Sequence, residues 1–384
     1  MMKNKIWPLV ILLALIISGY YLLRTEEQAR GPIKLGAVLP LTGDGAYWGE
    51  HTQRAINLAV ADINATGGIK GRKLELVLED GQCDPKTGVS ALQKLIAVDQ
   101  VPAVIGEVCS SVTVAMAPIA QAQGVVLITP CSEAPDITLG RDYVFRTWTP
   151  NNRQALTAVD YALRVIGVTK FAVLSINNDF GNALAGAFTA RLGELGAEIV
   201  AVEQYGPEDR DFKTQLIKIK AAKPEAIYLV SYPADGVIAV RQLKELGIAA
   251  TVITTSGADS EEEFFGPLAE LAEGIYFASL ADATSLAFRG RYAKTYAKEW
   301  PGVNSCAGVA YDDVALIASA MRAVGTDPAQ IKNYLSQVKD FAGVSGPITF
   351  DGARDLAREH SIFIYENGQR QLAPTERIVT PQGF

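Results

Sequence analysis

Histidine is almost missing from this sequence: His51 and His360 are the only two among 384 residues. Imidazole is the usual base in nucleophilic catalysis, so two isolated histidines far apart in the chain argue against a catalytic triad. The sequence also lacks a G-x-x-x-x-G-K-[ST] phosphate loop, an H-E-x-x-H metal motif, a G-x-S-x-G elbow and a G-x-G-x-x-G dinucleotide fingerprint. We therefore expect no enzyme activity, no cofactor and no metal ion.

Long runs of one charge are missing as well. The chain has 35 Lys and Arg against 42 Asp and Glu, a net charge of -7, and its basic residues are scattered singly. Because no basic stripe could neutralise a row of phosphates, we expect no nucleic-acid partner. The apolar content of 49% is ordinary for a globular protein, and a length of 384 residues favours two domains over one.

Cysteine is scarce, with only Cys83, Cys109, Cys131 and Cys306 in the chain. None of them forms a C-x-x-C pair, the short spacing that metal binding would need. An even count in an exported chain indicates disulfides, and four cysteines allow three pairings.

The first thirty residues differ from the rest of the chain. Lys3 and Lys5 precede an apolar run, Ile6–Leu23, which is long enough for a signal peptide or for a segment that crosses a membrane. In either case the positive flank stays in the cytoplasm and the remainder is exported. Ser18-Gly19 is the only small pair near a cleavage position, so residues 1–30 are a signal peptide or an N-terminal membrane anchor, and an uncleaved anchor is favoured slightly.

Short apolar runs alternate with helical patterns along the rest of the chain. A strand at Ile33–Leu39 and a helical pattern at Trp48–Ile63 begin a series that ends at Arg146, and the same alternation starts again after Asn152 and runs to Thr255. Buried strands that are each followed by a helix are typical of parallel sheets in α/β proteins. Two such sheets would place a ligand in the cleft between them, at the carboxyl ends of their strands.

The loops that follow these strands hold the candidate ligand-binding residues. These are Trp48, Ser110, Ser111, Cys131, Ser132 and Glu133 in the first half, and Phe180 and Tyr232 in the second. Ser110 and Ser111 open a predicted helix, where they could cap its N-terminus or hold a carboxylate. Trp48 follows a glycine-rich turn, and Trp48, Phe180 and Tyr232 could equally be packing residues.

Three segments in order resemble one family. They are Asp62–Leu74 with the motif D-I-N-A-T-G-G-I-K-G, Asp80–Lys86, and Ile105–Ser111. Together they resemble the branched-chain amino-acid (Leu/Ile/Val) binding proteins of ABC transporters, and the likeness runs from about Ile33 to the last strands. The resemblance implies the type I periplasmic-binding-protein fold, in which two Rossmann-like lobes with parallel central sheets are joined by a three-strand hinge.

The same resemblance implies a division of the chain. Crossings between lobes are expected near Thr149, Ala281 and Ser345. Lobe 1 is then expected to contain residues 33–148 and 275–344, and lobe 2 residues 149–274 and 345–384.

The resemblance also implies a Cys83–Cys109 disulfide, and because it places Cys131 and Cys306 in lobe 1, we expect those two to pair as well. By similarity, Ser110 would hold the α-carboxylate of a ligand and Cys131 would contribute a backbone group. Trp48, Phe180 and Tyr232 would form the wall around the ligand side chain.

Two departures from the family affect the ligand. Glu133 stands where the family has a threonine that touches both ligand carboxylate and ammonium, and Thr255-Ser256-Gly257 stands where the family has an acidic partner for the ammonium. A carboxylate gains energy beside an ammonium and loses it beside another carboxylate. The grip on an α-amino acid is therefore rearranged, with Glu133 taking over the ammonium, or the ligand is another small molecule, such as a cation.

These features predict an extracytoplasmic or periplasmic solute-binding protein of an ABC importer, tethered if its N-terminal segment stays uncleaved. Its expected partners are an amino acid or an analogue and the ABC permease subunits of the inner membrane. A ligand-sensing module of the same fold, signalling to a membrane partner, is the alternative. An exported hydrolase with Cys131 or a serine as nucleophile is a third reading, for which the sequence supplies no base.

Overall fold

The computed structural model describes residues 31–43, 45–280, 284–296 and 304–376. Within these ranges no helix is both long and apolar enough to cross a membrane. The expected signal or anchor segment at residues 1–30 lies outside the described residues, and so does the crossing expected near Ala281.

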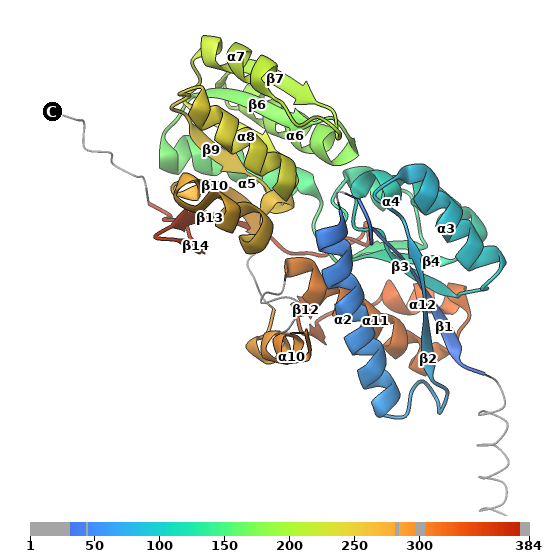
Figure 1. Cartoon of the computed structure of the whole chain (residues 1–384). Helices are drawn as coiled ribbons and strands as arrows, with labels where there is room; N and C mark the ends of the chain where they lie inside the picture. Colours follow the sequence, from blue (N-terminus) through green and yellow to red (C-terminus); the bar gives the residue numbers. More distant parts are fainter. Residues whose placement is uncertain (1–30, 44, 281–283, 297–303, 377–384) are drawn as a thin grey trace, which may run out of the picture.

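Lobe 1 is built on a five-stranded parallel sheet with the order β2-β1-β3-β4-β5. Its strand β1, between β2 and β3, is buried on both faces: Leu35 packs with helices α2 and α11, while Val38 packs with α3 and α4. This explains the continuous apolar runs in the sequence, since a parallel strand covered on both sides has no polar face. Figure 1 shows the lobe with α2 in front of the sheet. Its elements are β1 (Ile33–Leu39), α2 (Ala46–Ala65), β2 (Leu74–Asp80), α3 (Pro85–Ala97), β3 (Ala103–Gly106), α4 (Ser110–Gln123), β4 (Val126–Thr129), η1 (Pro135–Ile137), β5 (Val144–Arg146), α10 (Leu286–Tyr296), α11 (Ser305–Val324), α12 (Pro328–Leu335), β11 (Phe341–Gly343) and β12 (Gly346–Ile348).

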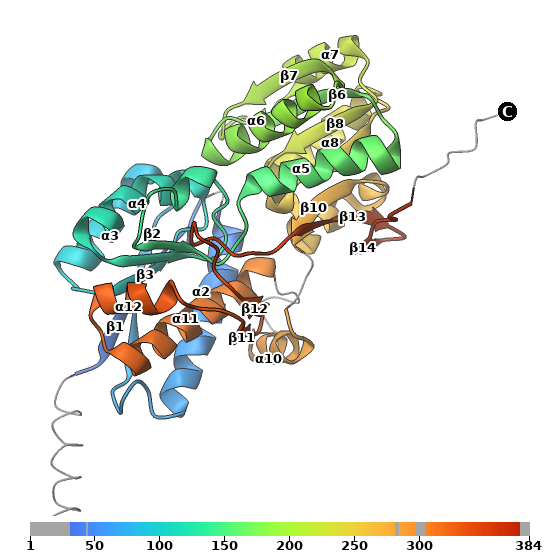
Figure 2. The ribbon, with the colours of Figure 1, turned by 180° about the vertical axis from the view of Figure 1, so that it is seen from behind.

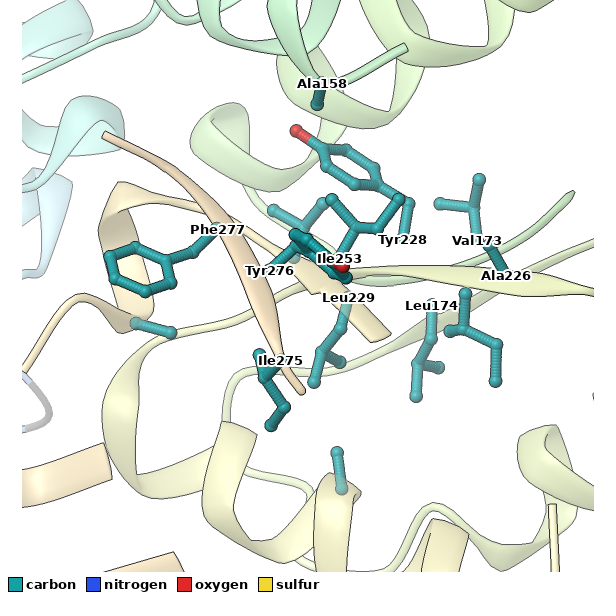
Figure 3. Packing of buried hydrophobic residues seen from close by; sticks show 14 of the residues in the cluster. Ala158, Val173, Leu174, Ala226, Tyr228, Leu229, Ile253, Ile275, Tyr276 and Phe277 are labelled. Carbon is teal, nitrogen blue, oxygen red and sulfur yellow. The ribbon is translucent and has the colours of Figure 1, made fainter. Parts of the chain in front are cut away.

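Lobe 2 is built on a seven-stranded sheet with the order β14-β13-β10-β9-β8-β6-β7, in which only β13 and β14 run antiparallel to their neighbours. Helix α8 covers one face in Figure 1 and α5 covers the other in Figure 2. Figure 3 shows the core between them, where Tyr228 on β8 and Phe277 on β10 are completely buried. Its elements are α5 (Asn151–Tyr161), η2 (Ala162–Ile166), β6 (Lys170–Ile176), α6 (Asp179–Glu194), β7 (Glu198–Tyr205), α7 (Lys213–Ala222), β8 (Ala226–Val230), α8 (Pro233–Glu245), β9 (Thr251–Thr254), η3 (Ser256–Ala258), η4 (Glu261–Phe265), α9 (Gly266–Leu268), η5 (Ala269–Ala272), β10 (Tyr276–Leu280), β13 (His360–Glu366) and β14 (Gln369–Leu372).

The expected lobe boundary at residue 275 is wrong. Strand β10 pairs in parallel with β9 and antiparallel with β13, so lobe 2 continues to Leu280. Its apolar residues Ile275, Phe277 and Ala278 belong to the core of lobe 2. A strand inserted next to a crossing carries the same apolar pattern in either lobe, and its pairing partners alone decide where it belongs.

The boundary expected at Ser345 is also wrong. Strands β11 and β12 form a small antiparallel hairpin, and Ile348, Phe350 and Leu356 pack in the core of lobe 1. The chain joins the sheet of lobe 2 only at β13. The last crossing therefore lies after Leu356, where no apolar residue binds the chain to either core until Ile362.

The hinge region is held to lobe 1 by a buried ion pair. Arg146, at the end of β5, is fully buried and bonds Asp355, which lies just before the last crossing, through Nε at 2.9 Å. Thr138 donates a further hydrogen bond of 2.9 Å to the same carboxylate. These bonds join the two parts of lobe 1 that lead into the first and the last crossing.

Both predicted disulfides are present. Cys83 is bonded to Cys109 and Cys131 to Cys306, with sequence separations of 26 and 175 residues. All four cysteines pack in the cores of lobe 1, and the pairing of Cys131 with Cys306 that was inferred from the shared lobe is confirmed.

Candidate functional site

A small cavity lies between the two lobes, at the carboxyl ends of their strands, with a volume of about 40 Å³ open to the centre of a water-sized sphere. This is where open α/β sheets bind ligands, because loops and helix N-termini meet there. Its lining from lobe 1 consists of Gly45, Trp48, Val108, Cys109, Ser110, Cys131, Glu133, Trp148, Ser305 and Cys306, and its lining from lobe 2 of Phe180, Tyr232, Ser256 and Gly257.

Ser110 provides a hydrogen-bond donor at the start of α4. Its Oγ accepts hydrogen bonds from the backbone amides of Glu133 at 2.9 Å and Ala134 at 3.2 Å. With both lone pairs engaged, the hydroxyl hydrogen remains for an acceptor in the cavity. Because the first amides of a helix and its dipole also favour negative charge, this corner suits a carboxylate.

Glu133 brings a carboxylate to the cavity wall. Its Oε1 accepts hydrogen bonds from Trp148 Nε1 at 2.8 Å and from Ser256 Oγ at 2.5 Å, and its Oε2 accepts one from Gln154 Nε2 at 3.3 Å. Burial raises the pKa of Glu133 to about 7, although these bonds and the Arg146 guanidinium oppose the shift. Ser256 and Gln154 belong to lobe 2, so Glu133 also connects the lobes.

Aromatic rings form much of the remaining wall. The rings of Phe180 and Tyr232 stack at 5.3 Å between centroids, on the side of lobe 2, while Trp48 and Trp148 line the side of lobe 1. Gly257 lies so close to Phe180 that a Cβ on it would come within 2.7 Å of the ring. The aromatic wall therefore depends on the absence of a side chain at position 257.

The two disulfides reach the cavity as well. Cys109, Cys131 and Cys306 are lining residues, and every cysteine of the described residues is bridged. A bonded Cys131 has no thiolate, so the hydrolase reading that used it as a nucleophile is wrong.

Two predicted site residues do not reach the cavity. Ser132 is fully buried behind its wall, where its hydroxyl contacts Thr113 and the carbonyl oxygen of Glu107. Ser111 follows Ser110 on α4, and a step of one residue turns a side chain about 100° around a helix. Neither is among the lining residues, whereas the other six candidates are.

The two histidines lie outside the lining residues. Burial lowers the pKa of His51 to about 4 and that of His360 to about 3, so both are neutral at pH 7. His360 contacts the hydroxyl of Thr149 at the first crossing. No imidazole among the described residues is therefore placed to serve as a base at the cavity.

Sequence reasoning missed several lining residues. Trp148 is the second residue after β5, so its position after a strand was a usable signal for the cavity wall. Ser256 is likewise the second residue after β9. From the sequence, Ser256 is notable only as part of a segment that lacks the acid of the family, and its position in the cavity lining is not predicted. The contact of Ser256 with Glu133 joins residues 123 positions apart and leaves no local pattern.

Comparison with known proteins gives consistent results. The family model described as "Periplasmic binding protein" matches residues 32–370. A curated relative from Brucella melitensis, "Leu/Ile/Val-binding protein homolog 3", is 31% identical over 352 residues, which cover 89% of this chain and 94% of that protein.

Solved structures show the same likeness. The branched-chain amino-acid binding protein LivJ from Streptococcus pneumoniae, in complex with isoleucine, superposes with a TM-score of 0.80 at 29% identity and covers 89% of this chain and 99% of its own. A solute-binding protein from Rhodopseudomonas palustris, in complex with 3,4-dihydroxybenzoic acid, has a TM-score of 0.74 at 25% identity and covers 87% and 93%.

Proposed function

We propose that this chain, which belongs to the periplasmic binding protein family, is the solute-binding subunit of an ABC importer. It takes an amino acid or a related small molecule into the cavity between its lobes. The observation that carries this proposal is the cavity itself, with a donor corner at Ser110 and an aromatic wall opposite. A small amphipathic acid fits such a site, since one end of the site is polar and the rest is apolar.

The ligand class rests on both relatives and geometry. The relatives include a protein solved with isoleucine and another solved with a dihydroxybenzoic acid, both of which carry a carboxylate and an apolar body. Ser110 and the start of α4 supply the carboxylate position, and Trp48, Phe180 and Tyr232 supply the apolar contact. Nothing in the names of these relatives favours the sensing alternative.

Location and partners follow from the family. Its periplasmic relatives support a position outside the cytoplasm, where disulfides persist. The cavity lies between two lobes that crossing segments of the chain connect, so we infer closure on the ligand and release to permease subunits in the inner membrane. Tethering through residues 1–30 remains a proposal that an intact-mass measurement of the mature protein would decide.

The variant Ser110→Ala is expected to weaken binding of a carboxylate ligand by about ten- to a hundredfold, because it removes one hydrogen bond to a charged group. Calorimetric titration with a panel of amino acids and aromatic acids measures the effect. Ser111→Ala is the matched control, since it deletes the neighbouring hydroxyl, which does not line the cavity. Equal affinities of the two variants would mean that the carboxylate does not lie at the start of α4.

A further inference from the structure

Glu133 is the one acidic or basic residue among the described residues that line the cavity; the lining contains no lysine, arginine or histidine. A ligand that enters this site therefore meets a single charged group. An anion with no cationic part would find no opposite charge in the wall.

In the part of the chain that the structure describes, no cation is bonded to the carboxylate of Glu133. Its hydrogen-bond donors are the neutral groups of Trp148, Gln154 and Ser256. The positive charge of Arg146 acts on this carboxylate, but its guanidinium is bonded to Asp355 and to the carbonyl oxygen of Ala134. An ionised carboxylate buried without a bonded cation is unfavourable, which is why burial raises its pKa to about 7.

The described residues with which lobe 2 lines the cavity include no second charged group. The hydroxyl of Ser256 is already donated to Glu133. Position 257 has no room for a side chain, because a Cβ there would lie 2.8 Å from the carbonyl oxygen of Ser231 as well as against Phe180. Within the segment in which the family carries its acidic ammonium partner, position 257 is thus closed to any side chain, and Ser256 presents a hydroxyl in place of an acid.

We propose that Glu133 selects ligands that carry a cationic nitrogen and that it releases a proton when such a ligand binds. This inference rests on the proposed function. In the empty cavity the carboxyl is partly protonated; the ligand cation stabilises its ionised form, the O–H bond breaks and the proton leaves to solvent. The ligand keeps its own ammonium protons, so one proton is released for each Glu133 that was neutral.

Other titratable groups in and around the two lobes limit the pH range of the effect. Burial raises the pKa of Glu107, below the disulfide at the start of α4, to about 8, so it is neutral up to that pH. Burial likewise raises the pKa of the buried Asp313 well above its usual value and that of Tyr228 far above neutrality. Other buried titratable groups are the ion pair of Arg146 and Asp355 on lobe 1 and the side chains of Tyr232 and His360 on lobe 2.

The sign of the pH dependence follows from Glu133. Binding of a cationic group lowers the pKa of this carboxyl. Affinity is therefore lowest at a pH so low that Glu133 is protonated both in the empty protein and in the complex. Affinity for leucine is expected to rise by about tenfold per pH unit toward pH 7, where the empty form ionises, and to level off above it. Ionisation of Glu107 near pH 8 would set the upper limit of this plateau.

The first test uses the unchanged protein with three probes of similar shape: leucine, 4-methylpentanoate, which lacks the amino group, and 3-methylbutylamine, which lacks the carboxylate. Leucine is expected to bind more tightly than 4-methylpentanoate by about ten- to a hundredfold at pH 7.5. If a solute without a cationic nitrogen binds most tightly, the inference is overturned and the proposed function stands. If none of the amino acids or acids binds, both fall.

The second test compares Glu133→Gln with Glu263→Gln. Glu263 also has a pKa raised by burial, to about 6, but it does not line the cavity. Calorimetry in two buffers of different ionisation enthalpy at pH 6.5 should detect proton release on leucine binding for the unchanged protein and for Glu263→Gln. Glu133→Gln should release none and should lose affinity for leucine but not for 4-methylpentanoate. Unchanged proton release in Glu133→Gln would overturn the inference.

Discussion

Replacing both Cys131 and Cys306 by serine is expected to lower the free energy of unfolding of lobe 1 by about 5 kcal/mol. The chain-entropy model gives this value because the bridge closes a loop of 175 residues, and a longer loop gains more freedom in the unfolded state when it is cut. Both cysteines also line the cavity, so the same variant should bind ligand more weakly. Denaturant unfolding followed by tryptophan fluorescence, with and without ligand, measures both effects.

The Cys83→Ser/Cys109→Ser variant is the matched comparison. Its loop spans 26 residues, and the model then gives a loss of about 3 kcal/mol. The unchanged protein should therefore be the most stable of the three and the Cys131 and Cys306 variant the least. The reverse order of the two variants would show that lobe 2 stays folded inside the longer loop and shortens its effective length.

Replacing Asp355 by alanine is expected to cost about 3–5 kcal/mol, because it leaves a fully buried guanidinium without its counter-ion. Arg146 has no solvent exposure and Asp355 only 8%, so water cannot replace the missing charge. The change should also weaken ligand binding, since Arg146 holds the carbonyl oxygen of Ala134 next to Glu133 at 2.8 Å. Thermal unfolding and ligand titration are the two measurements.

Asp351→Asn is the control for that variant, because the amide oxygen can still accept the hydrogen bonds that Asp351 Oδ1 receives from the backbone amides of Ala353 and Asp355. Asp351 lies four residues earlier on the same segment and pairs with Arg153, but their side chains are 27% and 34% exposed. A pair this exposed contributes about 0–1 kcal/mol. Similar losses in both variants would mean that the segment itself, rather than the buried charge, determines the stability.

The local pattern predicted most elements of the fold but could not assign all of them to a lobe. β1 has the predicted bounds, because it is buried on both faces and reads as one apolar run. β10 and β12 have ordinary apolar patterns, and each lies next to a crossing where either lobe could accept it. β10 pairs with β13, which is distant in the sequence, and β12 pairs with the neighbouring β11. The hydrophobic period and the composition of a strand do not specify which strand it pairs with.

The candidate site was predictable to the extent that it follows the ends of strands. Ser110, Glu133 and Tyr232 each stand just after a strand, and the structure brings all three to one cavity. The environment of Glu133 was not predictable, because its partners Gln154 and Ser256 belong to the other lobe. Those long-range contacts determine whether the side chain of an acid contacts a ligand or another residue, and whether it is protonated.

Lobe 1 is assembled from two distant parts of the chain, and this has a consequence during synthesis. Helix α2 packs its Ala55 and Ile56 in the same core as Val314 and Ile317 of α11, which emerges more than 250 residues later. Most of the core of lobe 2 lies between these parts and can form before α11 exists. The nascent first lobe therefore keeps an apolar face open while the second matures, and holdase chaperones and proteases should meet that face first.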